Sequence, residues 1–79
     1  MATLQEALEG VQNGKTYVHH YGDGVREFLS LRSDPDWAGY VQHDVIGSEG
    51  GGQACFTPET ISGLPHFTKN GWEPTGIIS

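Results

Sequence analysis

Turn-forming residues interrupt this chain at short intervals and limit the length of every regular element. Twelve glycines and four prolines occupy 16 of its 79 positions. The clearest turn signals are Asn13-Gly14, Gly22-Asp23-Gly24, 33–36 and Asn70-Gly71. Two Trp, three Tyr and three Phe residues supply bulky core material that disordered chains lack. The sequence therefore predicts one small folded domain, over residues 1–79, built from short elements.

The best-defined of these elements is an amphipathic helix near the N-terminus. Its apolar residues recur at the spacing of one helix face: Leu4, Ala7, Leu8 and Val11. Thr3 precedes them and Glu6 follows three residues later, which is the pattern of a capping box. A helix of about ten residues is marginal by itself, so its apolar face must pack against another element.

The rest of the chain shows the alternation and turn spacing of short strands. We predict strands at 16–21, 25–32, 37–46, 53–56 and, as a terminal edge strand, 72–78. A short helix should begin at Thr57 and end by Gly63, and the glycine-rich stretch at 47–52 should be flexible. Trp37 is expected in the core because large apolar side chains are few. The predicted fold class is α+β, a small antiparallel β-sheet with one N-terminal helix packed on it.

The charge balance argues against two large classes of partner. Ten acidic residues against four basic ones give a formal charge of −6. Nucleic acids and anionic membrane surfaces are bound mainly through Lys and Arg, so neither is an expected partner.

No apolar run approaches the roughly 20 residues that cross a bilayer, and no signal-peptide pattern is present. A single cysteine fits a reducing compartment, so we expect a cytoplasmic protein.

No residue pattern for catalysis or metal binding stands out. The four histidines do not have the spacing of a structural zinc site: His19, His20, His43 and His66. His19 and His20 are neighbours in a predicted strand, so they point to opposite faces. Cys55 lies in a strand-like segment, where a buried apolar role is expected, and the glycines at 50–52 lack the phosphate-loop pattern. We therefore expect exposed strand histidines, no catalytic residue, no metal, no cofactor and no enzymatic activity.

The order of short motifs resembles a known family. The motifs are Thr-Leu-Gln-Glu-Ala-Leu at 3–8, Asn-Gly-Lys at 13–15, Tyr-Gly-Asp-Gly at 21–24 and Phe-Leu-Ser-Leu at 28–31. In this order they resemble the opening of the small phage proteins of the Thoeris anti-defence nucleotide-sponge family. The helix at 57–63 and a strand at 71–73 would match the family's closing elements. The chain carries Tyr21 where the family has a tryptophan, and Gly71 where it has an aspartate.

The resemblance implies a non-enzymatic homo-oligomer that sequesters a signalling nucleotide of the ADP-ribose type between its subunits. Tyr21 and Trp72 align with aromatic positions of the family and are expected to stack on the base, because the core does not clearly require either one. Arg26, the cation nearest in sequence to Tyr21 on the following strand, is expected to bind the phosphates. The alternative hypothesis is a protein-binding inhibitor or regulator of a host enzyme or nucleic-acid-binding protein.

Overall fold

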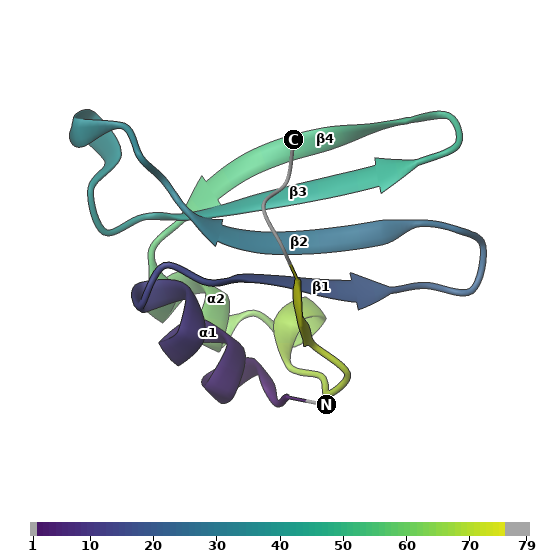
Figure 1. Cartoon of the computed structure of the whole chain (residues 1–79), viewed down its shortest axis with the longest axis horizontal. Coiled ribbons are helices and arrows are strands. Elements are labelled where there is room, and N and C mark those ends of the chain that lie inside the picture. The colour runs from purple at the N-terminus through teal and green to yellow at the C-terminus, as the bar shows by residue number, and fades with distance from the viewer. Residues whose placement is uncertain (1, 76–79) are drawn as a thin grey trace.

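A five-stranded antiparallel sheet forms the framework of the fold (Figure 1). The computed structural model describes residues 2–75. Its strands are β1 (Thr16–His20), β2 (Arg26–Leu31), β3 (Val41–Gly47), β4 (Gly50–Phe56) and β5 (Glu73–Thr75). They lie in the order β4-β3-β2-β1-β5, so the chain builds four strands by successive hairpins and then returns to add β5 beside β1.

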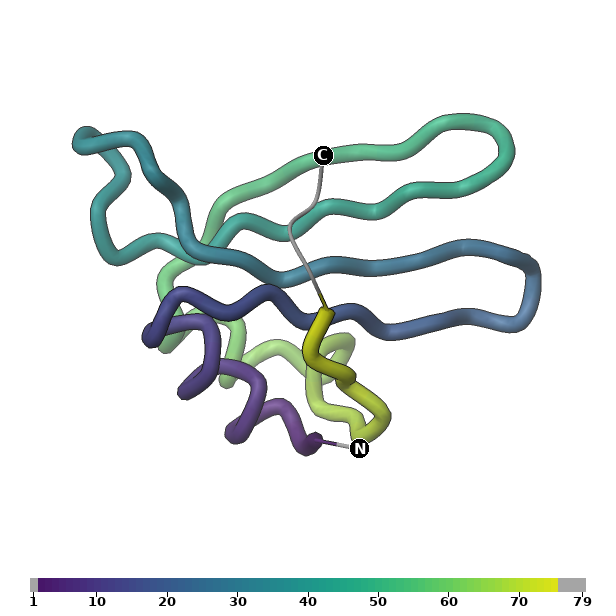
Figure 2. Tube along the Cα trace, in the orientation of Figure 1, coloured from purple at the N-terminus to yellow at the C-terminus, as the bar shows by residue number. Residues whose placement is uncertain are grey.

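The helical segments α1 and α2 cover one side of this sheet, as the trace in Figure 2 shows. The two helices are α1 (Leu4–Gln12) and α2 (Pro58–Gly63), and two 3₁₀ turns are η1 (Pro35–Trp37) and η2 (Pro65–Phe67). The predicted α+β class, with an N-terminal helix packed on a small antiparallel sheet, is confirmed.

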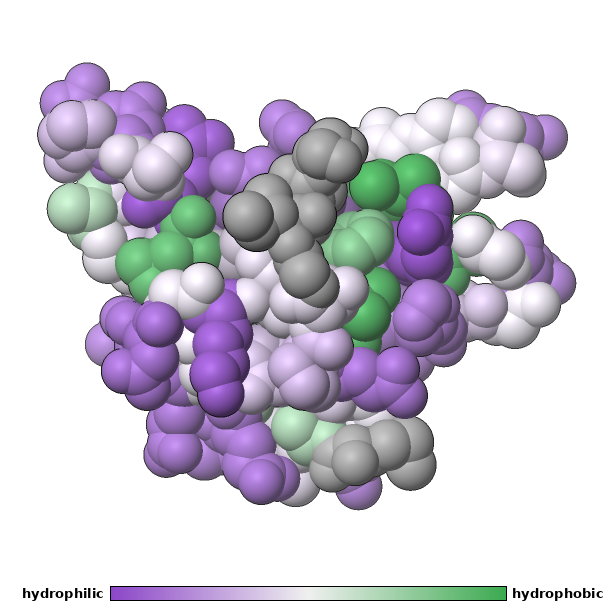
Figure 3. Space-filling view, viewed as in Figure 1, coloured by the Kyte–Doolittle hydropathy of each residue, from purple (hydrophilic) through white to green (hydrophobic). Residues whose placement is uncertain are grey.

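The N-terminal helix α1 begins with the predicted capping box. The Glu6 N–H donates to Thr3 Oγ1 at 3.2 Å, and the Thr3 N–H donates to Glu6 Oε1 at 3.1 Å. Its four apolar residues are buried against the sheet, while hydrophilic residues gather on its outer side (Figure 3). Local capping and tertiary packing therefore select the same helix.

Leu8 tests how much this packing contributes to stability. Its side chain is buried in the core with Tyr17, Leu29 and Ile61, so Leu8→Ala should lower the free energy of unfolding by about 2–5 kcal/mol. Gln5→Ala, on the exposed side of α1, is the matched control and should stay within about 0.5 kcal/mol of wild type. Urea unfolding followed by circular dichroism measures both. Equal effects of the two substitutions would contradict the packing of α1 on the sheet.

The third strand is shorter than the sequence predicts. Alternation favours a strand over 37–46, but residues Pro35–Trp37 form η1 and β3 begins only after it. Asp34 starts this turn by accepting a hydrogen bond from the Asp36 N–H at 3.0 Å. Trp37 is the last residue of η1, before the start of β3, and 42% of its surface is exposed. The expectation that Trp37 belongs to the core is therefore wrong.

Most of the glycine-rich stretch at 47–52 lies in paired strands, and only residues 48–49 form the turn between them. Strand β4 begins at Gly50 and pairs with β3 along its whole length, whereas the sequence predicts a strand only from Gln53. A Cβ atom at Gly51 would collide with the carbonyl oxygen of Val45. The close approach of two backbones thus explains a glycine that looks, in the sequence, like a sign of flexibility.

The last strand lies at the edge of the sheet, as predicted, with Pro74 at a position an edge strand tolerates. It spans Glu73–Thr75, and residues 76–78 of the predicted strand lie outside the described residues. Just before it, the backbone of Trp72 pairs with that of Ala2 through hydrogen bonds of 2.8 and 3.1 Å. The two ends of the described chain are therefore tied to each other.

Candidate functional site

The most unusual residue of the fold is a glutamate on the apolar side of the sheet. Glu27 lies in β2, opposite His19 of β1 and Val45 of β3, and faces the same side as Leu29. Its side chain is 0% exposed. An isolated carboxylate in such a place would be strongly destabilising, so its partners must offset the loss of hydration.

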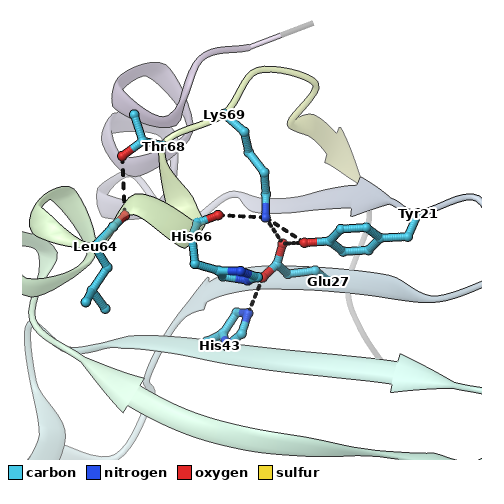
Figure 4. A network of polar contacts seen from close by, with 7 residues as sticks. All are labelled: Tyr21, Glu27, His43, Leu64, His66, Thr68 and Lys69. Atoms are coloured by element: carbon cyan, nitrogen blue, oxygen red, sulfur yellow. Dashed lines mark hydrogen bonds and ion pairs between the residues drawn. The ribbon is translucent and has the colours of Figure 1, made fainter.

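Four side chains from different parts of the chain supply these partners (Figure 4). The Tyr21 hydroxyl donates to Oε1 of Glu27 at 2.8 Å, and the Lys69 ammonium group lies 2.7 Å from the same oxygen. Nε2 of His43 and Nε2 of His66 lie 2.6 and 2.7 Å from Oε2. We call these five residues the Glu27 cluster.

Lys69 is held by three acceptors. Besides Oε1 of Glu27, its ammonium group donates to the Tyr21 hydroxyl at 2.6 Å and to the carbonyl oxygen of His66 at 3.0 Å. The same group lies 5.1 Å from the centre of the Tyr21 ring and 5.4 Å from that of Trp72. Such a lysine is pre-positioned, because every N–H of its ammonium group has an acceptor.

The contacts set the protonation states of the cluster. Burial raises the pKa of Glu27, but the hydrogen bonds from His43, Lys69, His66 and Tyr21 outweigh it and hold that pKa well below its ordinary value. Burial raises the pKa of Tyr21, while Lys69 opposes this rise and Glu27 adds to it. Burial lowers the pKa of Lys69, but Glu27 and Tyr21 reverse this effect and leave it raised. At neutral pH the cluster therefore contains a carboxylate, an ammonium group and a neutral phenol.

The cluster borders a surface pocket of about 360 Å³. The residues that line it are Tyr21, Asp23, Val25, Glu27, Val45 and His66. The side chain of His66 is 59% exposed, whereas that of His43 is only 13% exposed. His66 and the turn after Tyr21 therefore connect a buried ionic centre with solvent. This arrangement is typical of a binding site and not of a structural core.

The three residues predicted to bind a ligand have different surroundings. Tyr21 belongs to the Glu27 cluster. Trp72 is 0% exposed and packs in the core, so the expectation that packing does not require it is wrong. Arg26 is exposed on the opposite face of the sheet, where its guanidinium lies 5.8 Å from the centre of the Phe28 ring. The rings of Tyr21 and Trp72 both lie near the His19 ring, with centres 4.8 and 5.5 Å from it, whereas Arg26 lies on the other face of the sheet.

The expectation of exposed strand histidines is wrong for His43, which lies in a strand but is not exposed, and for His66 only in that it is exposed outside a strand. His43 is largely buried on β3, and His66 lies in η2, yet both contact one oxygen of Glu27. The donor atoms of Glu27, His43 and His66 all lie within 4.8 Å of one another. A signal was present in the sequence, because the alternation that turns Leu29 inward also turns Glu27 inward, and a buried carboxylate requires partners.

Comparisons of the chain with known proteins assign it to no family. None of the family models, curated proteins or solved structures compared with the chain matches it. Among residues 2–75, neither helix is long and apolar enough to cross a bilayer. Function must therefore be inferred from the Glu27 cluster and its pocket.

Proposed function

We propose that this chain is a non-enzymatic cytoplasmic protein that sequesters a small signalling nucleotide in the pocket beside the Glu27 cluster. One observation carries the proposal: the pocket joins an aromatic ring, an exposed imidazole and a carboxylate next to a lysine that is already held in place. Its volume of about 360 Å³ lies in the range typical of small-ligand sites, roughly 300–1,000 Å³.

Each part of a nucleotide has a matching group at this pocket. The Tyr21 ring offers a face for the base, and such stacking contributes about 1–3 kcal/mol per base in other proteins. The Asp23 carboxylate, which also lines the pocket, is an acceptor suited to ribose hydroxyls. The exposed His66 imidazole lines the pocket, and the Lys69 ammonium group, whose N–H groups are all engaged, adds the positive charge beside it that phosphates require in a chain of net charge −6. Lys69 takes the role that the sequence assigned to Arg26, because Arg26 lies on the other face of the sheet.

The family resemblance seen in the sequence supports the rest of the proposal. It implies that two or more copies of the chain hold the ligand between them without hydrolysing it. A pocket open to solvent on one chain fits this model, because a second copy can cover it. Native mass spectrometry should then show a homo-oligomer that retains the nucleotide.

Asp23 provides the test of the pocket. In calorimetric titrations with cyclic and linear ADP-ribose nucleotides, carried out with a chelator present, Asp23→Ala should weaken binding about tenfold, because a hydrogen bond to a charged group is lost. Asp36→Ala removes the same charge from the exposed turn η1 and is the matched control, with no loss expected. Chromatography of the ligand afterwards should recover it intact.

Two results would count against this function. Hydrolysed nucleotide would show that the protein is an enzyme, and equal losses for the two aspartate variants would place the ligand elsewhere. If the wild-type protein binds no nucleotide of the panel, the proposal fails. A stable complex with a host protein in a pull-down would then favour the alternative of a protein-binding inhibitor.

A further inference from the structure

Two histidine nitrogens approach a single carboxylate oxygen in the Glu27 cluster. Nε2 of His43 and Nε2 of His66 lie 2.6 and 2.7 Å from Oε2 of Glu27. We propose that Glu27, His43 and His66 form a binding site for a divalent transition-metal ion of the zinc class. This inference does not depend on nucleotide binding, because it concerns donor atoms that the chain itself brings together.

The donor set selects the kind of ion. Two imidazole nitrogens and one carboxylate oxygen are the protein ligands of many zinc sites that keep a fourth position open. Imidazole also suits Co²⁺, Ni²⁺ and Cu²⁺, whereas Mg²⁺ and Ca²⁺ prefer oxygen ligands alone. The side chain of His66 is 59% exposed and lines the pocket, so a water molecule or an anion can reach the fourth position.

Metal binding requires the two histidines to adjust their positions, because the three donor atoms lie within 4.8 Å of one another but not at tetrahedral spacing. A tetrahedral zinc ion with bonds of about 2.0–2.1 Å keeps its ligand atoms about 3.3 Å apart, so Nε2 of each histidine would move away from Oε2 by about 0.6–0.7 Å. His66 can make this movement because it lies in the short, exposed turn η2. Each neutral imidazole must also carry its proton on Nδ1, which leaves the lone pair of Nε2 for the ion.

The other oxygen of Glu27 supports the site. Oε1 is engaged by Tyr21 and Lys69, at 2.8 and 2.7 Å, so the carboxylate is oriented with Oε2 toward the histidines. Partners of this kind, which orient a metal ligand from behind, typically change metal affinity by about 10–100-fold. The ammonium group of Lys69 repels a cation, so an anion in the fourth position should strengthen metal binding.

Zinc titration of the chelator-treated, dialysed protein tests the proposal. Calorimetry with Zn²⁺ should show one ion bound per chain, Co²⁺ should give the visible absorption of a tetrahedral site, and Mg²⁺ should give neither. His66→Ala should weaken zinc binding by at least about tenfold, and the exposure of His66 allows the variant to fold. His20→Ala removes an exposed histidine from β1 and is the matched control, with unchanged affinity.

A second readout separates this site from scattered surface binding. Zinc should raise the melting temperature of the wild type and of His20→Ala, but not of His66→Ala. His66→Gln replaces the alanine variant if that one fails to fold. Equal zinc affinity in the wild type and the His66 variant, or an equal loss in His20→Ala, would overturn the proposal. Since this titration contains no nucleotide and the nucleotide titration contains a chelator, either site can fail alone.

Discussion

Trp72→Ala should destabilise the protein by about 3–5 kcal/mol, a large part of the stability of a small domain. The Trp72 side chain is 0% exposed and belongs to the same core cluster as Leu4, Leu8 and Phe67. Its backbone also holds the N-terminal segment through Ala2, so a cavity here would loosen both ends of the described chain. Denaturant unfolding measures the loss.

Trp72→Phe is the matched variant, because it keeps an aromatic ring in the core. The indole N–H of Trp72 is buried and has no hydrogen-bond partner among residues 2–75, so its removal offsets part of the lost packing. We expect phenylalanine to cost less than half of what alanine costs. A stable Trp72→Ala protein that has only lost ligand binding would restore Trp72 as a stacking residue and contradict its place in the core.

Glu27→Gln should cost about 3 kcal/mol at pH 7, near the lower end of what is lost when one partner of a buried ion pair is removed. The lower end applies because the side chains of Lys69 and His66 are 21% and 59% exposed, and water screens them. The glutamine side chain has one N–H₂ group where glutamate has a second oxygen. This donor would face groups that now donate hydrogen bonds to the Glu27 carboxylate. Glu49→Gln, in the exposed turn between β3 and β4, is the matched control and should have little effect.

The pH dependence of stability checks the same carboxylate. Its pKa is lowered in the folded protein, so its stabilising effect is present above the unfolded value of about 4.3 and is lost as the pH falls through the folded value. Urea unfolding should be measured between pH 7 and pH 3 with a chelator present. Below the unfolded pKa of about 4.3, the free energy of unfolding of the wild type should fall more steeply than that of Glu27→Gln. Parallel curves would mean that Glu27 is not ionised in the folded state.

The sequence by itself determined the elements whose causes are local. Helix α1 follows from the spacing of its apolar residues and from the Thr3–Glu6 capping box. The start of α2 follows from Thr57 as a cap and Pro58 after it. The first hairpin follows from the alternation of its strands on either side of Gly22-Asp23-Gly24. In each case the deciding interactions join residues a few positions apart, so the pattern can be read directly.

Only the tertiary structure decided which of these residues form a site. Lys69 and Tyr21 lie 48 positions apart in the chain, and Glu27 and His66 lie 39 apart. They meet because the β1–β2 hairpin brings Tyr21 to Glu27 and because η2 and the residues after it return over the same face of the sheet. The burial of Trp72 likewise depends on its bridge to Ala2 at the other end of the described chain. Contacts of this range are set by strand register and by packing of the whole domain, which the residues nearby in sequence do not encode.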